Sequence, residues 1–216
     1  MSYTGEVTVG GPVDVRETSG LTITKVATPP FENNCYVLRC TATGKTLLVD
    51  AAGDGPQLLA LSGDALVGVV ETHDHWDHVG ALEQVVTASG APVLAHEADA
   101  DDLPVPTTRR LVDGDTVQVG EAVLSVIHLL GHTPGSLALL YEGDPERPHL
   151  WSGDSLFPGG HGKTDTFEDH LTLMDDLEAK VFGRLPDQTW VYPGHGKDTT
   201  LGAERASLPE WRERGW

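Results

Sequence analysis

The chain has 216 residues, of which 14 are Lys or Arg and 33 are Asp or Glu, so its formal net charge is −19. A surface this acidic repels polyanions, and nucleic acid is therefore not an expected partner. The length suffices for one domain with a hydrophobic core, and the sequence lacks a run of about eighteen apolar residues that could span a bilayer. We expect a single domain over residues 1–216, with a C-terminal tail from about 200 to 216, and no membrane partner.

The N-terminus and the cysteines bear on the cellular compartment. Residues 1–6 lack the basic and apolar regions of a secretory signal, so the cytoplasm is the expected location. Cys35 and Cys40 flank one predicted strand, and five strand residues span about 16 Å, well beyond the ~7 Å that a disulfide allows. Both cysteines should be free, buried thiols.

Alternating apolar and β-branched residues predict strands through much of the chain. The predicted strands are 21–26, 35–38, 46–50, 65–70, 92–95, 117–119, 123–127, 137–141, 149–151 and 190–192, and the predicted helices are about 56–61, 79–86 and 170–182. Strands and helices that follow one another in this way indicate an α/β fold.

The stretch between Thr72 and Val79 is rich in potential metal ligands. It holds three imidazoles and two carboxylates in six consecutive residues, directly after the apolar strand 65–70. Ligands in open α/β sheets gather at the carboxyl ends of strands. Because residues i and i+2 of an extended segment point to one side, His73 and His75 can bind one ion, while Asp77 and His78 beyond the bend face a second. The sequence therefore predicts a metal site here.

Three other polar residues near the predicted strands receive supporting roles. Asp74 should point away from the metal and act as a hydrogen-bonding support or a helix cap. His96 is expected at the rim of the site, and His128 is expected to pack, because the ligand position that follows its strand is taken by His132.

The motif His-x-His-x-Asp-His resembles the signature of the metallo-β-lactamase superfamily. Three later motifs of that family follow in the expected order, and the resemblance covers about residues 21–200. They are Gly131-His132-Thr133-Pro134-Gly135-Ser136, Ser152-Gly153-Asp154-Ser155 and Pro193-Gly194-His195-Gly196. The resemblance implies a four-layer αβ/βα sandwich, in which two facing sheets carry helices on their outer sides.

The resemblance also implies a set of ligands for two divalent ions. Carried over by position, they are His73, His75 and His132 for the first ion, Asp77, His78 and His195 for the second, and Asp154 between them. Asp77 and Asp154 are then the predicted catalytic residues. Zinc is the expected metal, with iron and manganese as alternatives, because His and Asp ligands suit all three. Asp50 matches a buried aspartate that supports the metal loops in the family, and a plain turn residue is the alternative.

Such a ligand set predicts hydrolysis. Two divalent ions ~3.5 to 4 Å apart can hold a bridging water and lower its pKa toward ~7, which gives a hydroxide at neutral pH. The ions also stabilise a developing oxyanion. An amine usually needs protonation as it leaves, whereas a thiolate, with a parent pKa near ~8.5, leaves unaided. Since the sequence offers no obvious general acid outside the ligand set, a small-molecule thioester is a better substrate than an amide.

The bridging position distinguishes branches of the family. β-Lactamases of the superfamily usually have Cys there and are exported, whereas this chain has Asp154. It is more similar to the glyoxalase II branch, the hydroxyacylglutathione hydrolases, which cleave S-D-lactoylglutathione. In that branch a lysine nine residues after the bridging Asp contacts the carboxylate of the thiol, and Lys163 has this spacing. The resemblance therefore implies a glyoxalase II-like thioesterase in which Lys163 contacts the substrate.

Two departures from the glyoxalase II pattern leave the identity of the thiol open. Asp165 replaces the aromatic residue expected two positions after the lysine, and only about twenty residues follow His195, so the C-terminal helical domain of the longer enzymes has no counterpart here. We therefore expect a short-form enzyme, with thiols other than glutathione as alternatives and with Lys163 as either a substrate contact or a solvated loop charge.

Three other functions remain open. A persulfide dioxygenase of the same fold would bind a single iron through His73, His132 and Asp154, and a lactonase would act on acyl-homoserine lactones. An inactive metal-binding scaffold that serves a partner protein is the non-enzymatic alternative. The sequence leaves the oligomeric state open, and the tryptophans of the C-terminal tail, Trp211 and Trp216, could pack on the body or on a second subunit.

Overall fold

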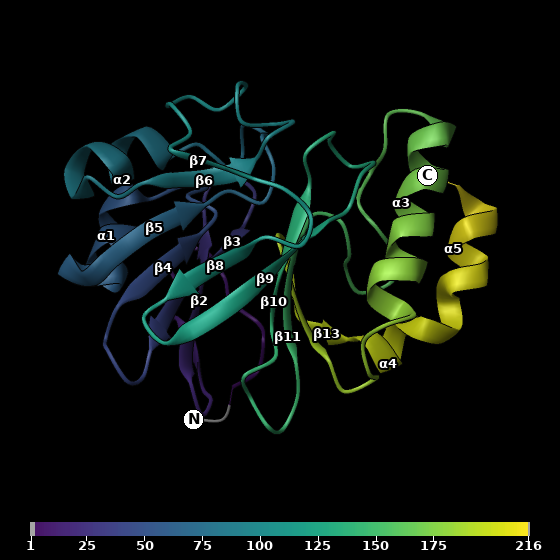
Figure 1. The fold of residues 1–216 in the computed structure, drawn as a ribbon, viewed down its shortest axis with the longest axis horizontal. Helices are drawn as coiled ribbons and strands as arrows, with labels where there is room; N and C mark the ends of the chain where they lie inside the picture. The colour runs from purple at the N-terminus through teal and green to yellow at the C-terminus, as the bar shows by residue number, and fades with distance from the viewer. Residues whose placement is uncertain (1–2, 216) are drawn as a thin grey trace.

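Two β-sheets face each other and carry helices on their outer sides in the computed structural model, which describes residues 3–215 (Figure 1). The seven-stranded sheet has the order β1-β2-β3-β4-β5-β6-β7, and the six-stranded sheet has the order β13-β12-β11-β10-β9-β8. Helices α1 (Gly55–Ser62) and α2 (Leu82–Ser89) cover the first sheet, and α3 (Phe167–Asp176) and α5 (Leu208–Arg214) cover the second. The predicted four-layer αβ/βα sandwich is confirmed.

The remaining elements have the following bounds. The strands are β1 (Asp14–Glu17), β2 (Leu21–Thr28), β3 (Asn33–Cys40), β4 (Thr46–Val49), β5 (Leu66–Val70), β6 (Val93–His96), β7 (Arg109–Leu111), β8 (Thr116–Val119), β9 (Ala122–His128), β10 (Leu137–Tyr141), β11 (His149–Gly153), β12 (Trp190–Pro193) and β13 (Thr199–Thr200). The shorter helical segments are η1 (Gly63–Ala65), the π-helical η2 (Leu177–Phe182), α4 (Leu201–Glu204) and η3 (Arg205–Ser207).

The strand directions bring distant loops to one edge of the sandwich. Strands β4, β5, β6 and β7 pair in parallel, and so do β11 and β12, whereas the other pairs are antiparallel. Parallel neighbours end at the same edge of a sheet, so the loops after β4 and β5 lie together, as do the loops after β11 and β12. All the candidate ligands occur in loops that follow strands.

Apolar side chains form three layers of core. The layer between the sheets includes Leu21, Ile23 and Trp151, and a second layer beneath α1 and α2 includes Leu58 and Leu82. A third layer lies beneath α3, η2 and α5 and includes Leu173, Leu177 and Trp211, which is 1% exposed. The C-terminal segment therefore packs on the body of this chain through Trp211, and Trp216 lies outside the described residues.

Short capping signals account for where the helices begin and end. Asp54 accepts a hydrogen bond from the backbone of Gln57 at the start of α1, and Thr166 accepts one from Asp169 at the start of α3. Because Thr166 is the N-cap, α3 begins at Phe167, earlier than the predicted residue 170. Gly90 adopts the left-handed conformation (φ 69°) that ends α2.

Three edge strands were not predicted from the sequence. β1, β7 and β13 have two to four residues and are mostly half-buried or exposed, so they lack the apolar alternation of the inner strands. Cys35 and Cys40 are buried free thiols at the two positions predicted for them. Within residues 3–215, none of the helices has both the length and the apolar character needed to cross a membrane.

Candidate metal centre

Asp50 fixes the start of the loop that follows β5. Its backbone has a positive φ of 57°, and its carboxylate accepts hydrogen bonds from the backbone N–H of Thr72 at 2.7 Å and from the Thr72 hydroxyl at 2.9 Å. The same carboxylate accepts from Nδ1–H of His78 at 2.9 Å. This contact leaves Nε2 of His78 for the interior of the site, and it confirms the supporting role predicted for Asp50.

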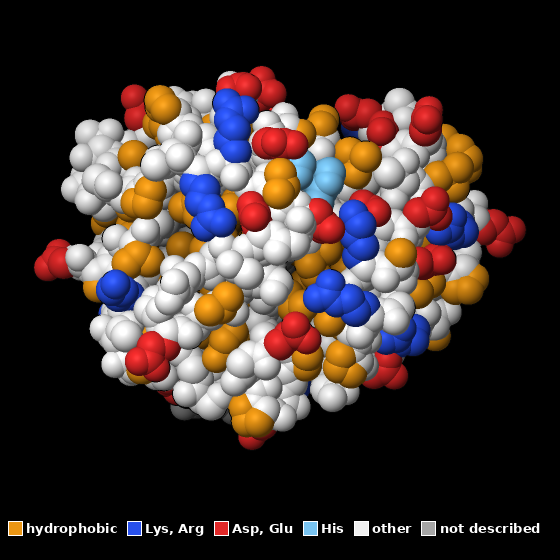
Figure 2. Space-filling model, in the orientation of Figure 1, with side chains coloured by type: hydrophobic (Ala, Val, Ile, Leu, Met, Phe, Trp, Pro, Cys, Tyr) orange, Lys and Arg blue, Asp and Glu red, His pale blue; other side chains and the backbone are white. Residues whose placement is uncertain are grey.

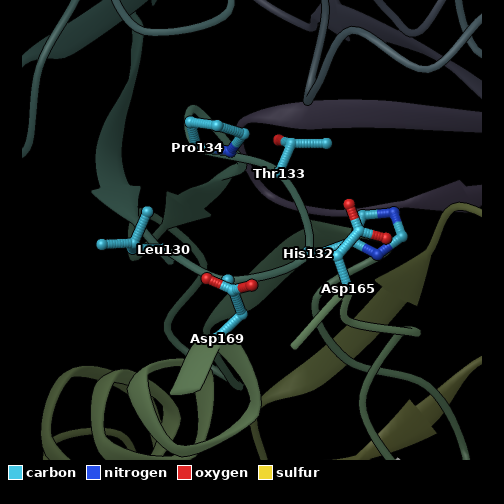
Figure 3. A pocket seen from close by; sticks show the side chains of 7 residues that line it. Leu130, His132, Thr133, Pro134, Asp165 and Asp169 are labelled. Atoms are coloured by element: carbon cyan, nitrogen blue, oxygen red, sulfur yellow. The ribbon is translucent and has the colours of Figure 1, made fainter. Parts of the chain in front are cut away.

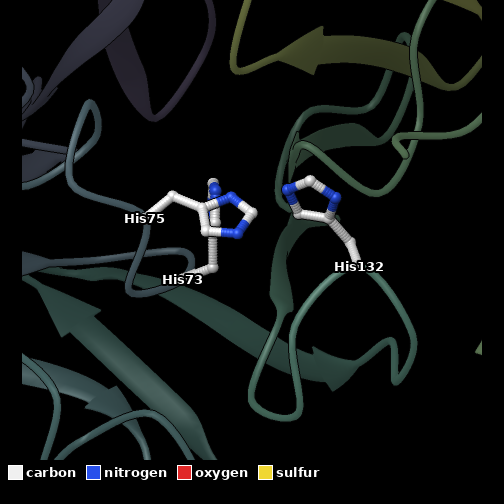
Figure 4. A group of neighbouring side chains, drawn as sticks. All are labelled: His73, His75 and His132. Atoms are coloured by element: carbon white, nitrogen blue, oxygen red, sulfur yellow. The ribbon is translucent and has the colours of Figure 1, made fainter. Parts of the chain in front are cut away.

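Three histidines from two loops form the first group of candidate ligands. His73 and His75 come from the loop after β5, and His132 comes from the loop between β9 and β10; Figure 4 shows their rings lying close together. One nitrogen from each lies within 4.8 Å of the other two, so the three rings can converge on one ion.

Asp77, His78 and His195 form the second group, with one ligand atom from each within 4.8 Å of the others. Nε2 of His195 lies 3.2 Å from Nε2 of His78 and 3.4 Å from Oδ2 of Asp77. Asp154 lies between the two groups, with Oδ1 3.3 Å from Nε2 of His78 and Oδ2 3.8 Å from Nε2 of His132. The structure thus brings together all the residues that the sequence predicts as ligands.

Several polar atoms of this centre are buried without a partner. Nε2 of His73, Nε2 of His132 and Oδ1 of Asp154 have no hydrogen-bond partner among residues 3–215. An unpaired buried polar group costs about 1–3 kcal/mol, and more when it is charged. A divalent cation would satisfy all three atoms, so the residues present fit a metal.

Hydrogen bonds on the far side of two rings orient them for this role. Nδ1–H of His132 donates to the backbone carbonyl of Lys163 at 2.7 Å, and Nδ1–H of His73 donates to the Thr72 hydroxyl at 3.0 Å. When Nδ1 carries the proton, the lone pair is on Nε2, which is the form that binds a metal.

The charge states also suit a cation. Burial lowers the pKa of the His73 and His132 imidazoles, and the neighbouring His78 adds to this effect at His73. Burial opposes the charge on Asp154, but His78, His73 and His195 together outweigh it and hold the pKa of that carboxyl well below its usual range. Burial opposes the charge on His78 as well, but Asp154 and Asp50 outweigh it and raise the pKa of that imidazole. Neutral imidazoles, as at His73 and His132, and an ionised carboxylate are the protonation states that coordinate divalent metals, so a bound cation would displace the proton of His78.

Asn33 is a neighbour of the centre that sequence reasoning missed. It is fully buried at the start of β3, and its side-chain amide donates to Oδ2 of Asp77 at 2.9 Å. The next residue, Asn34, donates to the backbone carbonyls of Pro193 and Gly196, on either side of His195. The Asn33 amide therefore holds Asp77 directly, and the Asn34 amide holds the loop that carries His195. The consecutive polar residues in a buried strand were the available signal.

Asp99 is a second missed residue. It is buried and accepts a hydrogen bond from the Thr133 hydroxyl at 2.6 Å, beside His132. Burial raises the pKa of Asp99 to about 6, although the backbone N–H groups of Gly135 and Asp74 favour its charged form. Asp99 thus lies against both loops of the first group. Asp74 itself belongs to none of the three groups of candidate ligands found in residues 3–215, the third of which is His73, His78 and Asp154.

His96 and His128 lie outside the centre, as expected, but His96 is not at a rim. Its ring is buried and stacks on the ring of His128, with centroids 3.9 Å apart and an interplanar angle of 14°. Nε2–H of His128 donates to the backbone carbonyl of Pro134 at 2.9 Å. The pair packs against the loop that carries His132, so the prediction of a packing role for His128 is confirmed.

A cavity of about 130 Å³ opens beside His132 (Figure 3). Its lining is partly apolar and partly acidic, and comprises Leu130, Gly131, His132, Thr133, Pro134, Asp165 and Asp169. The Lys163 side chain is exposed, while its carbonyl accepts from His132. Figure 2 shows histidine side chains at the surface near acidic residues on this face of the molecule.

The protein-family model of the metallo-β-lactamase superfamily matches residues 28–195, a range that contains every candidate ligand. The chain belongs to this superfamily. The family fold implies the binding of divalent metal, and we therefore describe the chain as a metallo-β-lactamase superfamily hydrolase.

Known proteins of the metallo-β-lactamase superfamily match most of the chain. Hydroxyacylglutathione hydrolase of Rhodospirillum rubrum is 36% identical over 166 residues, which are 76% of this chain and 62% of that protein. The chain thus spans less than two thirds of the length of that relative. The structure of the B3 metallo-β-lactamase BLEG-1 has a TM-score of 0.77 and 28% identity, over 88% of this chain and 99% of that one. The di-iron-bound form of TTHA1623 has a TM-score of 0.69 and 31% identity, over 86% and 98%.

Proposed function

We propose that the chain is a binuclear metallohydrolase of the glyoxalase II type, which cleaves S-acyl thioesters such as S-D-lactoylglutathione. The observation that carries this proposal is that His73, His132 and Asp154 each hold a buried atom without a hydrogen-bond partner: the two histidines belong to the first group of candidate ligands, and Asp154 lies between the two groups. The di-iron form of TTHA1623 supports two ions, and the name of the relative from Rhodospirillum rubrum supports the substrate class.

The residues of the chain take distinct roles in this proposal. His73, His75 and His132 would hold one ion, Asp77, His78 and His195 would hold the other, and Asp154 lies where it could serve both. When bound, two divalent ions would supply an ionised water at neutral pH and a positive charge for the developing oxyanion. Asp50 and the Lys163 carbonyl keep Nε2 of His78 and of His132 directed inward.

The neighbours of the centre favour a leaving group that needs no proton. Asn33 faces Asp77 with an amide, which is not an acid, and Asp50 already accepts three hydrogen bonds. A thiolate leaves without protonation, whereas an amine does not. A thioester therefore matches this site better than an amide.

Lys163 is proposed as a contact for an anionic thiol. Its side chain is exposed, and its backbone carbonyl is hydrogen-bonded to His132, so the side chain begins next to the centre. Lys163→Ala should raise KM for lactoylglutathione about fivefold while kcat changes less, because a charge contact at a surface contributes on the order of 1 kcal/mol. Lys45→Ala, in the exposed turn between β3 and β4, is the matched control. An unchanged KM in Lys163→Ala would remove this residue from the substrate site.

The whole proposal is tested by elemental analysis combined with a substrate panel. The panel contains lactoylglutathione, an acyl-homoserine lactone, a β-lactam, and glutathione persulfide with oxygen consumption as its readout. We expect two metal ions per chain and the highest kcat/KM with the thioester. A single iron with oxygen consumption would instead indicate a dioxygenase, preferential turnover of the lactone or the β-lactam would indicate those hydrolases, and a metal-loaded protein without turnover would indicate a scaffold.

A further inference from the structure

Two aromatic side chains project into solvent next to the metal centre. Phe31, in the loop between β2 and β3, is 58% exposed, and Trp76, inside the motif between His75 and Asp77, is 65% exposed. Their rings contact each other edge to face, with centroids 5.4 Å apart and an interplanar angle of 73°. Together they present a continuous apolar surface that the protein itself does not cover.

This aromatic pair lies on the His195 side of the centre. The backbone carbonyl of Phe31 accepts a hydrogen bond from Nδ1–H of His195 at 3.4 Å, and Trp76 adjoins two candidate ligands in the chain. The ring of Phe157 lies 6.4 Å from that of His195 and extends the aromatic surroundings. The backbone of each residue of the pair is thus next to a candidate ligand, and the two rings support each other.

The surface beside His132 has a different character. The cavity beside His132 contains Asp165 and Asp169, and the backbone of Lys163 contacts His132. A thioester whose carbonyl lies between the two ligand groups extends one half toward each side. If the thiol half lies toward Lys163, as the proposed function requires, the acyl half is free to lie toward Phe31, whose carbonyl contacts His195, and toward Trp76.

We propose that Phe31 and Trp76 form the acyl-binding surface and that the chain prefers thioesters of apolar acyl groups, aromatic ones above all. This inference rests on the proposed function and names its substrate class. A phenyl group can stack on one ring and meet the edge of the other, whereas the methyl group of a lactoyl unit leaves most of both rings in water. Two side chains are too few for a stable protein interface, which needs roughly 1,000 Å² or more, so a small ligand is the matching occupant.

A matched pair of substrates tests the proposal. Lactoylglutathione and mandeloylglutathione share the thiol and the 2-hydroxyl group and differ only in methyl against phenyl. We expect kcat/KM of the wild-type protein to be about tenfold higher for the mandeloyl ester, as the burial of a phenyl group against aromatic rings predicts. Trp76→Ala should abolish this preference, because it should lower kcat/KM for the mandeloyl ester about tenfold more than for the lactoyl ester.

Three controls make the result specific. Phe167→Ala removes an aromatic ring that is 63% exposed on α3, and it should preserve the preference. Elemental analysis of Trp76→Ala must show the wild-type metal content, and Phe31→Ala replaces it if metal is lost. Mandeloyl and lactoyl esters of N-acetylcysteamine should show the same preference. If Trp76→Ala changed kcat/KM for glutathione esters but not for N-acetylcysteamine esters, whichever acyl group they carry, the proposal would be overturned.

A binding measurement separates this inference from the proposed function. Isothermal titration of the metal-loaded protein should show tighter binding of mandelate than of lactate, and Trp76→Ala should remove the difference. If no thioester is hydrolysed but the mandelate preference persists, the proposed function fails and the apolar acyl site stands. Equal affinity for the two acids, or equal kcat/KM for the two esters, would overturn the acyl site alone.

Discussion

Two buried polar clusters in this molecule differ in how completely their atoms are paired. Around Asp198, the carboxylate accepts hydrogen bonds from Lys25 at 2.6 Å, from the Tyr3 hydroxyl at 2.6 Å and from the Trp190 indole at 2.8 Å. Lys25 is fully buried, and its ammonium group also donates to the carbonyls of Gly5 and Gly196 at 2.8 Å. All three N–H groups of the Lys25 ammonium group are thus hydrogen-bonded.

The metal centre is buried to a similar degree but leaves atoms unpaired. His73, His132 and Asp154 each present a buried atom with no partner among residues 3–215. Most buried polar groups in proteins have partners, so the exceptions call for an explanation. The comparison teaches that pairing, and not burial or charge, separates a cluster that holds the fold from one that binds a ligand.

The largest effect is expected when a side chain of the metal centre is removed. Asp154→Ala should lose one or both metal ions and lower kcat/KM by roughly 10³-fold or more, because the bridging carboxylate contacts both ligand groups. Elemental analysis and thioester hydrolysis measure the two effects. A variant with normal metal content and a normal rate would contradict the bridging role.

The next largest effect is expected when the hydrogen-bonded cluster around Asp198 loses its cation. Lys25→Met should lower the free energy of unfolding by about 3–5 kcal/mol, because it leaves the buried charge of Asp198 without its partner. Urea denaturation measures the change, and Lys45→Met at an exposed position should stay within about 0.5 kcal/mol of the wild type. In the double variant Lys25→Met/Asp198→Asn the loss should be smaller than in Lys25→Met. An equal or larger loss would show that the charge pair is not the cause.

The smallest effect concerns Asp99, which has an incomplete set of partners. Its pKa is raised from 3.8 to about 6, so the folded chain holds this proton more tightly than the unfolded chain. The contribution of the Asp99 side chain to the free energy of unfolding therefore falls as pH rises from about 4 to 6. Relative to the wild type, Asp99→Asn should gain unfolding free energy over this interval. Denaturation curves at matched metal content measure it, with Asp64→Asn at an exposed site as the control; parallel pH profiles for wild type and Asp99→Asn would refute it.

The metal centre was more predictable from the sequence than its supports were. His73, His75 and Asp77 lie within a few positions of one another, so their chemistry shows in the linear order. Asp99 and Asn33 act through contacts with residues 34 and 44 positions away, and such contacts have no local pattern. The supports therefore become visible only in three dimensions.

The same limit applies to the fold. The other strands were predicted because apolar residues line at least one of their faces, whereas β1, β7 and β13 are short and mostly half-buried or exposed. Lys25 occupies a strand position that a charged residue usually takes only when it faces water, and its burial depends on Asp198, far along the chain. Trp211 likewise covers α3 and η2 through a short helix whose packing partner the sequence did not identify.

The hydrogen bond from His132 to Lys163 has a consequence for redesign. The acceptor is a main-chain carbonyl, so the identity of the side chain at position 163 does not enter the contact. A library of substitutions at this position can therefore explore new leaving groups while the imidazole keeps its orientation. Under the proposed function, a change of leaving group and retention of the metal ligands would be separable tasks at this point of the loop.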